Sequence, residues 1–262
     1  MRIKRDKILS FVSDGEERAM LARVLDQAEI VLHHGRNQLT DFYDPYSNNL
    51  INAAIQQLNL TATSSGGYPG AERQRLVLHL AEAQVTAVDF DFGFISIAGN
   101  FKYSRVSHRD FLGALLGLGL KRGKFGDIIV LDDRAIVVVA REIAPYLKAN
   151  LCKVGRTRVH VSELKQDELP QRAISYREIK STVSALRLDA VAAAGFGTSR
   201  SKITREIEAE KISINWRVCP SPKTMVKQGD VISARGKGRV ILAAVQGQLK
   251  SGRIGILLHR LF

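Results

Sequence analysis

Cations follow a helix-capping residue in the last third of the chain, in an arrangement that could bind a phosphate group. Thr198 or Ser199 can be the N-cap residue of a helix, and Arg200 and Lys202 follow. Ile203 and Ile207 continue with the i, i+4 spacing of a helix face. Cations in the first turn oppose the helix dipole, whereas a bound anion would pair with them and with the free backbone N–H groups. The spacing predicts an anion site, with a solvated basic helix face as the alternative.

Two short helices and a small sheet are expected to position these cations. In order, we expect a helix from Arg187 that Gly195 and Gly197 end, the helix from Ser199, and strands over 211–218 and 231–233. With Arg187-Leu188-Asp189 and Gly229-Asp230, this order resembles the S4-like fold. The resemblance implies a domain that presents a basic face to structured RNA.

Two further loops carry cations beside glycines, which would let phosphates approach the backbone. They are Lys121-Arg122-Gly123-Lys124 and Arg235-Gly236-Lys237-Gly238-Arg239. The predicted RNA-binding residues are Arg187, Ser199, Arg200, Lys202, Arg205, Asn215, Arg235, Lys237, Arg239, Lys121, Arg122 and Lys124.

Asn215 occupies the expected turn of the hairpin within residues 211–218. S4-like domains usually carry Gly after this Asn, but Trp216 stands here, which puts a tight type I′ turn in doubt. We expect Trp216 to cover the small core, and stacking on a base is the alternative.

Charge is distributed unevenly along the 262 residues, whose net charge is +13. Residues 1–100 hold 9 Lys and Arg against 12 Asp and Glu, residues 101–180 hold 16 against 9, and residues 181–262 hold 14 against 5. The excess of positive charge therefore belongs to the C-terminal two thirds, as expected of a protein that docks on a polyanion.

The middle of the chain predicts a ferredoxin-like order of elements. Strands are expected over 86–97, 128–131, 135–140 and 159–164, with helices over 108–116 and 141–151. Ser107 and Asp110 have the spacing of a capping box. Phe90, Phe92 and Phe94 alternate along the first strand, and we expect burial under the two helices in preference to base stacking.

Residues 108–129 carry a more specific signature. His108-Arg109-Asp110-Phe111-Leu112-Gly113-Ala114-Leu115-Leu116-Gly117-Leu118-Gly119, Lys121-Arg122 and Gly126-Asp127-Ile128-Ile129 resemble the YlmH-like S4-domain proteins, which include a cyanobacterial and plastid photosystem II group. Gly66-Gly67-Tyr68-Pro69-Gly70-Ala71-Glu72-Arg73 resembles the same family's connection between its first two parts. The resemblance implies a non-enzymatic protein that binds rRNA, and possibly tRNA, on the ribosome, on its large subunit, in translation or ribosome quality control. It also implies a link to photosystem II biogenesis.

The expected class is α+β with three domains. They are a helical region over 1–84, the ferredoxin-like domain over 85–170 and the S4-like domain over 171–262. The segment 63–67 is rich in Gly and Ser and predicts a flexible connection. His33-His34 should end a helix, since adjacent residues point apart and suit a metal poorly. Cys152 and Cys219 have no metal-ligand spacing and are expected to be buried thiols.

Several short motifs resemble those of enzymes, but the sequence around each of them does not fit the enzyme class. His108-Arg109-Asp110 and Asp91-Phe92-Gly93 occur in the reverse of kinase order, and Gly123-Lys124 and Gly236-Lys237 lack the upstream glycine of a phosphate-binding loop. Arg187-Leu188-Asp189 resembles the catalytic triplet of pseudouridine synthases, but only 73 residues follow it. An RNA-modifying enzyme and a photosystem assembly factor acting by protein contacts remain the alternatives, and no catalytic residue, cofactor or metal is predicted.

No apolar run reaches the roughly 18 residues that a membrane span needs, and the N-terminus lacks the pattern of a signal or transit peptide. We therefore expect a cytoplasmic protein, or a stromal one in an organism with plastids.

Overall fold

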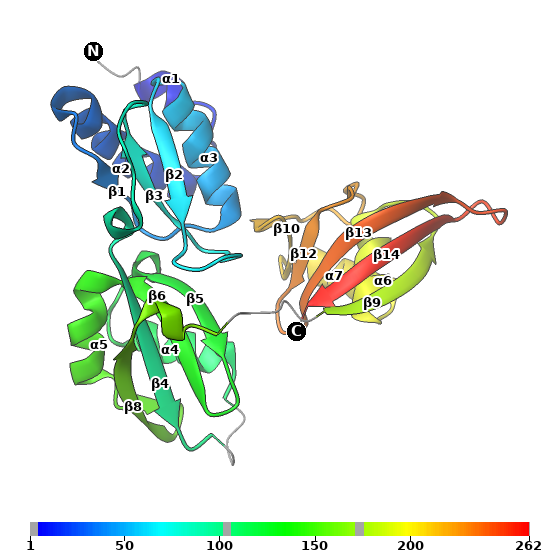
Figure 1. The fold of residues 1–262 in the computed structure, drawn as a ribbon. Helices are drawn as coiled ribbons and strands as arrows, with labels where there is room; N and C mark the ends of the chain where they lie inside the picture. The colour runs from blue at the N-terminus through cyan, green and yellow to red at the C-terminus, as the bar shows by residue number, and fades with distance from the viewer. Residues whose placement is uncertain (1–4, 102–105, 171–175, 262) are drawn as a thin grey trace. The chain divides into compact units, whose positions relative to one another are not determined.

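The structure is a computed structural model that describes residues 5–101, 106–170 and 176–261. The chain divides into two compact units, residues 1–170 and residues 171–262. Helices and strands are both abundant in it, as the predicted α+β class requires (Figure 1).

The first part of unit 1 combines helices with a three-stranded sheet of order β1-β3-β2. Its elements are α1 (Arg5–Leu9), α2 (Gly15–His34), β1 (Gln38–Leu39), α3 (Pro45–Gln56), β2 (Thr61–Ser65) and β3 (Arg75–His79). The flexible connection predicted over 63–67 is wrong for Thr63–Ser65, because these residues pair with β3. The helix α2 ends at His33-His34 as predicted, with Gly35 in the left-handed conformation after it.

The second part of unit 1 has the ferredoxin-like order of elements. They are η1 (Ala87–Phe90), β4 (Phe92–Gly99), α4 (His108–Gly117), η2 (Arg122–Lys124), β5 (Phe125–Val130), β6 (Arg134–Ala140), η3 (Arg141–Ile143), α5 (Ala144–Asn150), β7 (Lys153–Val154), β8 (Thr157–Leu164) and η4 (Gln166–Glu168). The antiparallel sheet has the order β5-β6-β4-β8-β7, so the predicted βαββαβ arrangement is confirmed. Ser107 and Asp110 form the predicted capping box of α4.

The first strand of this sheet starts later than predicted, because residues 87–90 form a 3-10 turn. Phe90, Phe92 and Phe94 are buried as expected, but they do not lie under the helices. Their partners include Phe42 and Val77 of the N-terminal part, whereas α4 and α5 pack on the opposite face of the sheet. The N-terminal part therefore covers a sheet face that RNA-recognition modules leave open for bases.

A carboxylate fastens the two parts of unit 1 to each other. Asp127 of β5 accepts hydrogen bonds from the Tyr68 hydroxyl at 2.6 Å and from the backbone N–H groups of Glu72 at 2.8 Å and Arg73 at 3.0 Å. The Arg73 guanidinium in turn donates to the backbone oxygen of Phe42 at 2.6 Å. The segment that resembles the YlmH-like connection is thus anchored by hydrogen bonds to both parts of unit 1.

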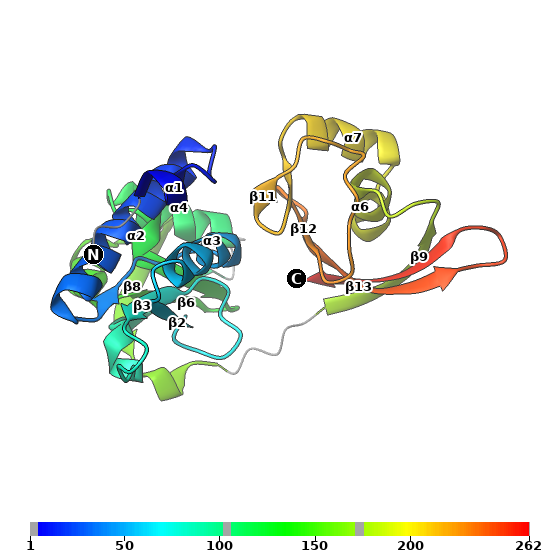
Figure 2. The same cartoon turned by 90° about the horizontal axis from the view of Figure 1, so that it is seen from above.

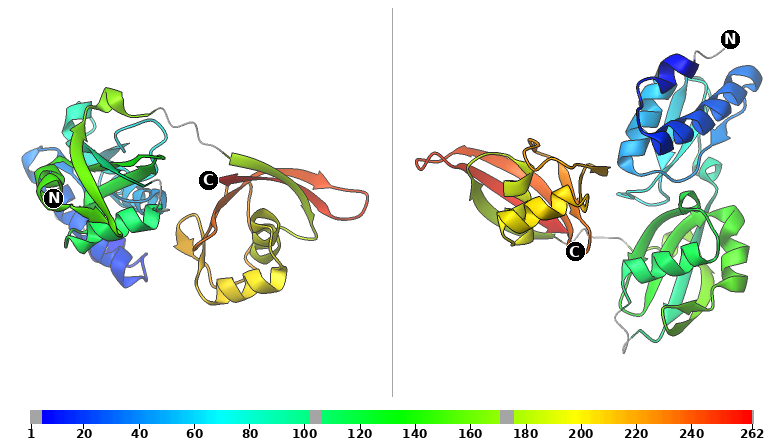
Figure 3. Two further views of the ribbon diagram at one scale, coloured as in Figure 1. Left: turned by 90° about the horizontal axis from the view of Figure 1, so that it is seen from below. Right: turned by 180° about the vertical axis from the view of Figure 1, so that it is seen from behind.

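Unit 2 packs two helices against a six-stranded antiparallel sheet, seen from above in Figure 2. Its elements are β9 (Tyr176–Val183), α6 (Leu188–Phe196), α7 (Arg200–Glu208), β10 (Ile212–Ile214), β11 (Arg217–Val218), β12 (Val231–Ala234), β13 (Gly238–Gln248) and β14 (Ile254–Leu261). The sheet order is β11-β10-β12-β13-β14-β9, so the sheet is larger than the small one predicted. The hairpin of β13 and β14 projects beyond the helices (Figure 3).

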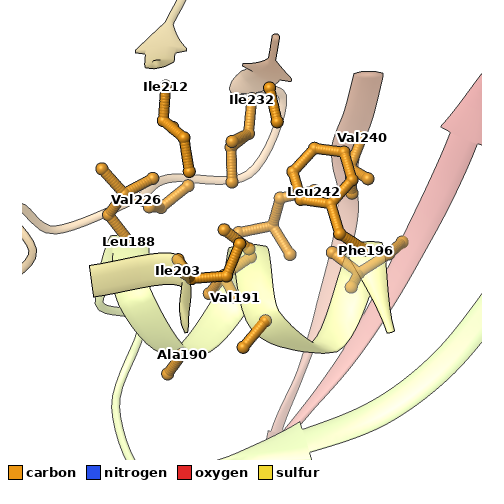
Figure 4. Packing of buried hydrophobic residues seen from close by; sticks show 14 of the residues in the cluster. Leu188, Ala190, Val191, Phe196, Ile203, Ile212, Val226, Ile232, Val240 and Leu242 are labelled. Carbon is orange, nitrogen blue, oxygen red and sulfur yellow. The ribbon is translucent and has the colours of Figure 1, made fainter. Parts of the chain in front are cut away.

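The core of unit 2 lies between the helix pair and the sheet (Figure 4). Ile203 and Ile207 of α7 are fully buried, which confirms the predicted apolar face of this helix. Gly195 of α6 lies so close to β13 that a Cβ atom there would be 2.6 Å from Cγ1 of Val240. Gly197 ends α6 in the left-handed conformation, as predicted.

The expectation of two buried thiols is wrong. Cys152 is exposed and Cys219 is half-buried, and both are free cysteines. Leu151 takes the inward position at the end of α5, which leaves the next residue, Cys152, facing solvent.

Candidate nucleic-acid interface

Asp189 organises the side chains at the start of both helices of unit 2. Its carboxylate accepts hydrogen bonds from Arg200 at 2.8 Å and from Arg187 at 2.9 and 3.2 Å. Only 4% of Asp189 is exposed. Burial disfavours the charged carboxylate, but the hydrogen bonds from Arg200 and Arg187 outweigh burial and hold the pKa of Asp189 below its usual value. Asp189 therefore fixes two guanidinium groups that remain partly open to solvent.

The N-terminus of α6 is closed by the chain itself. Its first two backbone N–H groups, of Leu188 and Asp189, donate to the backbone oxygens of Thr224 at 2.8 Å and Pro222 at 3.2 Å. An anion site at this helix end is thereby excluded, because the donors are already used.

The N-terminus of α7 is open by contrast. Ser199 is the N-cap, and its hydroxyl accepts from the backbone N–H of Lys202 at 3.3 Å, as the sequence predicted. Within the described part of the chain, the backbone N–H groups of Arg200 and Ser201 have no acceptor. Lys202 and Arg205 are exposed on the following turns, and Arg205 makes only a 3.5 Å contact with the backbone oxygen of Ser201. This helix end can accept a phosphate.

Asn215 and Trp216 form a tight turn despite the missing glycine. Both have positive φ angles, 49° and 67°, and the strands pair as Ile214 with Arg217, which leaves a two-residue loop. The doubt about a type I′ turn is thus removed. The Asn215 side chain donates to Asp230 at 2.9 Å and accepts from the backbone N–H of Val231 at 2.9 Å, so it holds the hairpin to β12.

Trp216 does not contribute to the core of unit 2, so the expectation that it covers this core is wrong. It is half-exposed at the tip of the hairpin and is absent from the residues that pack against the core.

The loop between β12 and β13 presents cations unequally. Arg235 is exposed, while Lys237 pairs with both oxygens of Glu206 at 2.7 Å. Arg239 is half-buried at the start of β13. Arg235 is therefore the cation of this loop most open to a ligand.

In the loop before β5, residues 121–124, two of the three cations make contacts within unit 1. Lys124 pairs with Asp41 at 2.8 Å and Glu142 at 2.9 Å, and Arg122 donates to the backbone oxygen of Phe125 at 2.6 Å. Burial, and then the nearby charge of Arg73, lowers the pKa of Arg122 to about 10. Lys121 alone in this loop is exposed.

Arg253 is a cation that the sequence analysis missed. It stands just before β14, and its guanidinium donates to the Thr182 hydroxyl at 2.8 Å and to the Thr182 backbone oxygen at 2.6 Å. No motif marks either residue, because they are brought together only by the pairing of β9 with β14.

No helix among the described residues is long and apolar enough to cross a membrane. Within the same ranges, no group of three or more His, Cys, Asp or Glu side chains could hold a metal ion.

Comparison with known proteins covers almost the whole chain. Family models match in order over residues 16–83 (YlmH, N-terminal), 86–168 (putative RNA-binding domain in YlmH) and 186–232 (S4 domain). A protein of Bacillus subtilis (strain 168) named ribosome-associated protein quality control protein P2 is 33% identical over 245 residues, which are 94% of this chain and 95% of that protein. The chain belongs to the YlmH family.

A solved structure described as cell division protein ylmH from Streptococcus pneumoniae gives a TM-score of 0.52 at 25% identity. It covers 61% of this chain and 98% of its own. The YlmH assignment confirms the resemblance found in residues 66–73 and 108–129, and the matched models describe a putative RNA-binding domain and an S4 domain. Which of its residues contact RNA stays a prediction.

Proposed function

We propose that the protein binds structured ribosomal RNA without catalysing a reaction, and that the first turn of α7 is its principal contact. The open backbone N–H groups of Arg200 and Ser201, beside the exposed Lys202 and Arg205, carry this proposal. A phosphate at this helix end would accept hydrogen bonds from the backbone N–H groups and form ion pairs with the cations. Contacts with phosphates supply a large share of the affinity of proteins that bind nucleic acids.

Arg187 and Arg200, which Asp189 joins, extend this surface, and Arg235 adds an exposed cation on the loop between β12 and β13. Asp189 holds the first two in place, so they lose little side-chain entropy when they bind, and a guanidinium can bind a phosphate through two hydrogen bonds. Asn215 and Lys237 are engaged by Asp230 and Glu206, so we give them a structural role, and Arg239 remains a proposed contact.

The same geometry argues against RNA modification at Asp189. A pseudouridine synthase needs an aspartate that can reach a base, but Asp189 is almost fully buried and its oxygens are engaged by two arginines. We therefore give this carboxylate a positioning role.

The large ribosomal subunit is the proposed partner, with tRNA as a second possible contact, in translation or ribosome quality control. The name of the Bacillus relative supports a role at the ribosome in quality control, and the family description of residues 86–168 as a putative RNA-binding domain supports a second contact region. The photosystem II link and the cytoplasmic or stromal location stay predictions.

Replacing Lys202 and Arg205 together by Gln tests the proposal. Binding of the full chain to large-subunit rRNA should weaken at least about 10-fold, and the slope of log K against log salt should become shallower by roughly 1 to 2, because two phosphate contacts are lost. The control variant, Lys7→Gln with Arg18→Gln, removes the same charge from exposed positions of the acidic N-terminal part and should bind like the wild type. Equal affinities for the two double variants would reject the α7 surface.

Ribosome association provides a second measurement. The protein should sediment with large subunits and lose that association after RNase treatment. Sedimentation that survives complete digestion of the RNA would indicate a protein partner instead.

A further inference from the structure

A groove of about 300 Å³ lies on unit 2, beside α6, and core residues such as Ala190 and Ala193 form part of its wall. The end of β9, α6, the turn before α7 and the residue before β14 line it. Two arginines, Arg200 and Arg253, are among its lining residues, and no carboxylate is. Such a groove attracts an anion.

The floor of the groove is made of small apolar side chains. Ala190 and Ala194 contribute to it from α6. In Figure 4 the side chain of Ala190 lies on the side of α6 that is turned away from Ile212 and Ile232. A longer side chain at either alanine would fill the space that these methyl groups leave open.

Both arginines of the groove are fixed by hydrogen bonds and still have N–H donors that these bonds do not use. Arg253 uses two of its five N–H groups on Thr182, and Arg200 uses one on Asp189. The remaining donors can bind a phosphate through paired hydrogen bonds, and the existing bonds reduce the entropy lost on binding.

The size and chemistry of the groove fit one nucleotide of an RNA strand. A volume of about 300 Å³ is at the lower end for small-molecule sites, too small for a duplex. The arginines match the phosphate, the hydroxyls of Ser184 and Thr198 can hydrogen-bond the sugar, and the alanines offer an apolar surface to it.

We propose that this groove binds one phosphate and ribose of the RNA and so extends the contact surface from α7 to the β9–β14 side of the domain. This proposal rests on the RNA binding proposed above, and it goes beyond the residues of the matched S4 model, because Thr182 and Arg253 lie outside residues 186–232.

Arg253→Gln tests the groove, with Lys250→Gln as a control. Both side chains are exposed in the same hairpin segment, and both changes remove one positive charge, but Lys250 does not line the groove. On large-subunit rRNA, Arg253→Gln should weaken binding about 5- to 10-fold and reduce the salt slope by roughly 1, whereas Lys250→Gln should change affinity less than about 2-fold. Arg253→Lys keeps the charge without the paired donors and should bind with intermediate affinity.

Ala194→Leu tests the same groove without changing the charge. Leucine suits a helix and would occupy the floor, so RNA affinity should fall about 5-fold while Trp216 fluorescence shows unit 2 folded. If Arg253→Gln and Lys250→Gln weaken binding equally and Ala194→Leu binds like the wild type, the groove is not a binding site. If the wild type shows no salt-dependent affinity for the RNA, the proposed function itself fails, and the two failures are distinguishable.

Discussion

At the scale of single residues, Asp189 links the stability of unit 2 to its binding surface. It is a nearly buried carboxylate whose charge two arginines balance. Asp189→Asn leaves two guanidinium groups without their countercharge, but both are partly open to solvent, so the loss is smaller than for a fully buried ion pair. We expect Asp189→Asn to lower the free energy of unfolding by about 1 to 2 kcal/mol. Trp216 is the single tryptophan and lies in unit 2, so its fluorescence in urea reports this unit within the full chain.

The contribution of Asp189 should also depend on pH. Its folded-state pKa lies below the unfolded value of about 3.9, so the stabilisation is fully present above that value and is lost as pH falls through the folded-state pKa. The stability difference between wild type and Asp189→Asn should be constant from about pH 5 to 7 and shrink below about pH 4. Glu208→Gln, an exposed change of the same kind, should stay within about 0.5 kcal/mol of the wild type.

Arg200 and Lys202 should respond differently to the same substitution. From the sequence, both look like cations that add nothing to stability, but Arg200 donates to Asp189 and Lys202 makes no ion pair among the described residues. Arg200→Ala should lower the free energy of unfolding by up to about 1 kcal/mol, since its ion pair with Asp189 is half-exposed. Lys202→Ala should leave the free energy of unfolding almost unchanged. Both should weaken RNA binding. Equal urea midpoints for the two variants would contradict the role given to Asp189.

At the scale of elements, α6 packs on β13 at a distance that only glycine permits. A Cβ atom at Gly195 would meet Val240 at 2.6 Å, whereas one at Gly113 of α4 would meet nothing within 4 Å. Gly195→Ala should therefore destabilise unit 2 by about 1 to 3 kcal/mol through overpacking. Gly113→Ala should stabilise its helix by about 0.5 to 1 kcal/mol, because alanine loses less backbone entropy on folding. Calorimetry of the two variants would show shifts of opposite sign, and shifts of the same sign would refute the packing argument.

The elements of the chain could be predicted where the cause is local. The capping box at Ser107 was predicted, Gly197 was one of two glycines expected to end its helix, and Ser199 was one of two candidate N-caps, because each of these features depends on neighbouring residues. The residues that cover the phenylalanines of β4 were not predicted. They include Phe42 and Val77, which are distant in the sequence and leave no local pattern around β4. Strand β2 was missed because its Thr and Ser residues are typical of loops as well.

The candidate site shows the same division. The cations and the capping residue predicted an anion site at the N-terminus of α7. The ion pairs of Lys124 with Asp41 and of Lys237 with Glu206 could not be predicted, because they depend on contacts between elements. Arg253 reaches the surface beside Arg200 through sheet pairing alone. Sequence patterns thus identified the kind of ligand, whereas the packing decides which cations are free to bind it.

At the scale of the whole molecule, the N-terminal part is a structural cover for the middle sheet. Residues 1–84 lack the excess of positive charge that the rest of the chain carries, which suggests a region that could be removed without effect. Its loss would nevertheless expose Phe92 and Phe94 and leave Asp127 without its partners. We expect the fragment 85–262 to aggregate or to bind a hydrophobic dye strongly, while the fragment 171–262 stays folded as a compact unit. A soluble 85–262 fragment that unfolds cooperatively would show that this cover is dispensable.

Two compact units on one chain can hold one RNA more tightly than either does alone. Residues 86–168 match a putative RNA-binding domain and residues 186–232 an S4 domain, so the second contact is intramolecular once the first has formed. The gain is about 10² to 10⁴ in affinity when both units reach the RNA at once.

The fragment for comparison must begin at 171, because a cut at 181 would remove most of β9 and its pairing with β14. The full chain should therefore bind large-subunit rRNA at least about 100-fold more tightly than fragment 171–262 and with a steeper salt slope. Equal affinity and equal slope would assign the first unit to a partner other than this RNA.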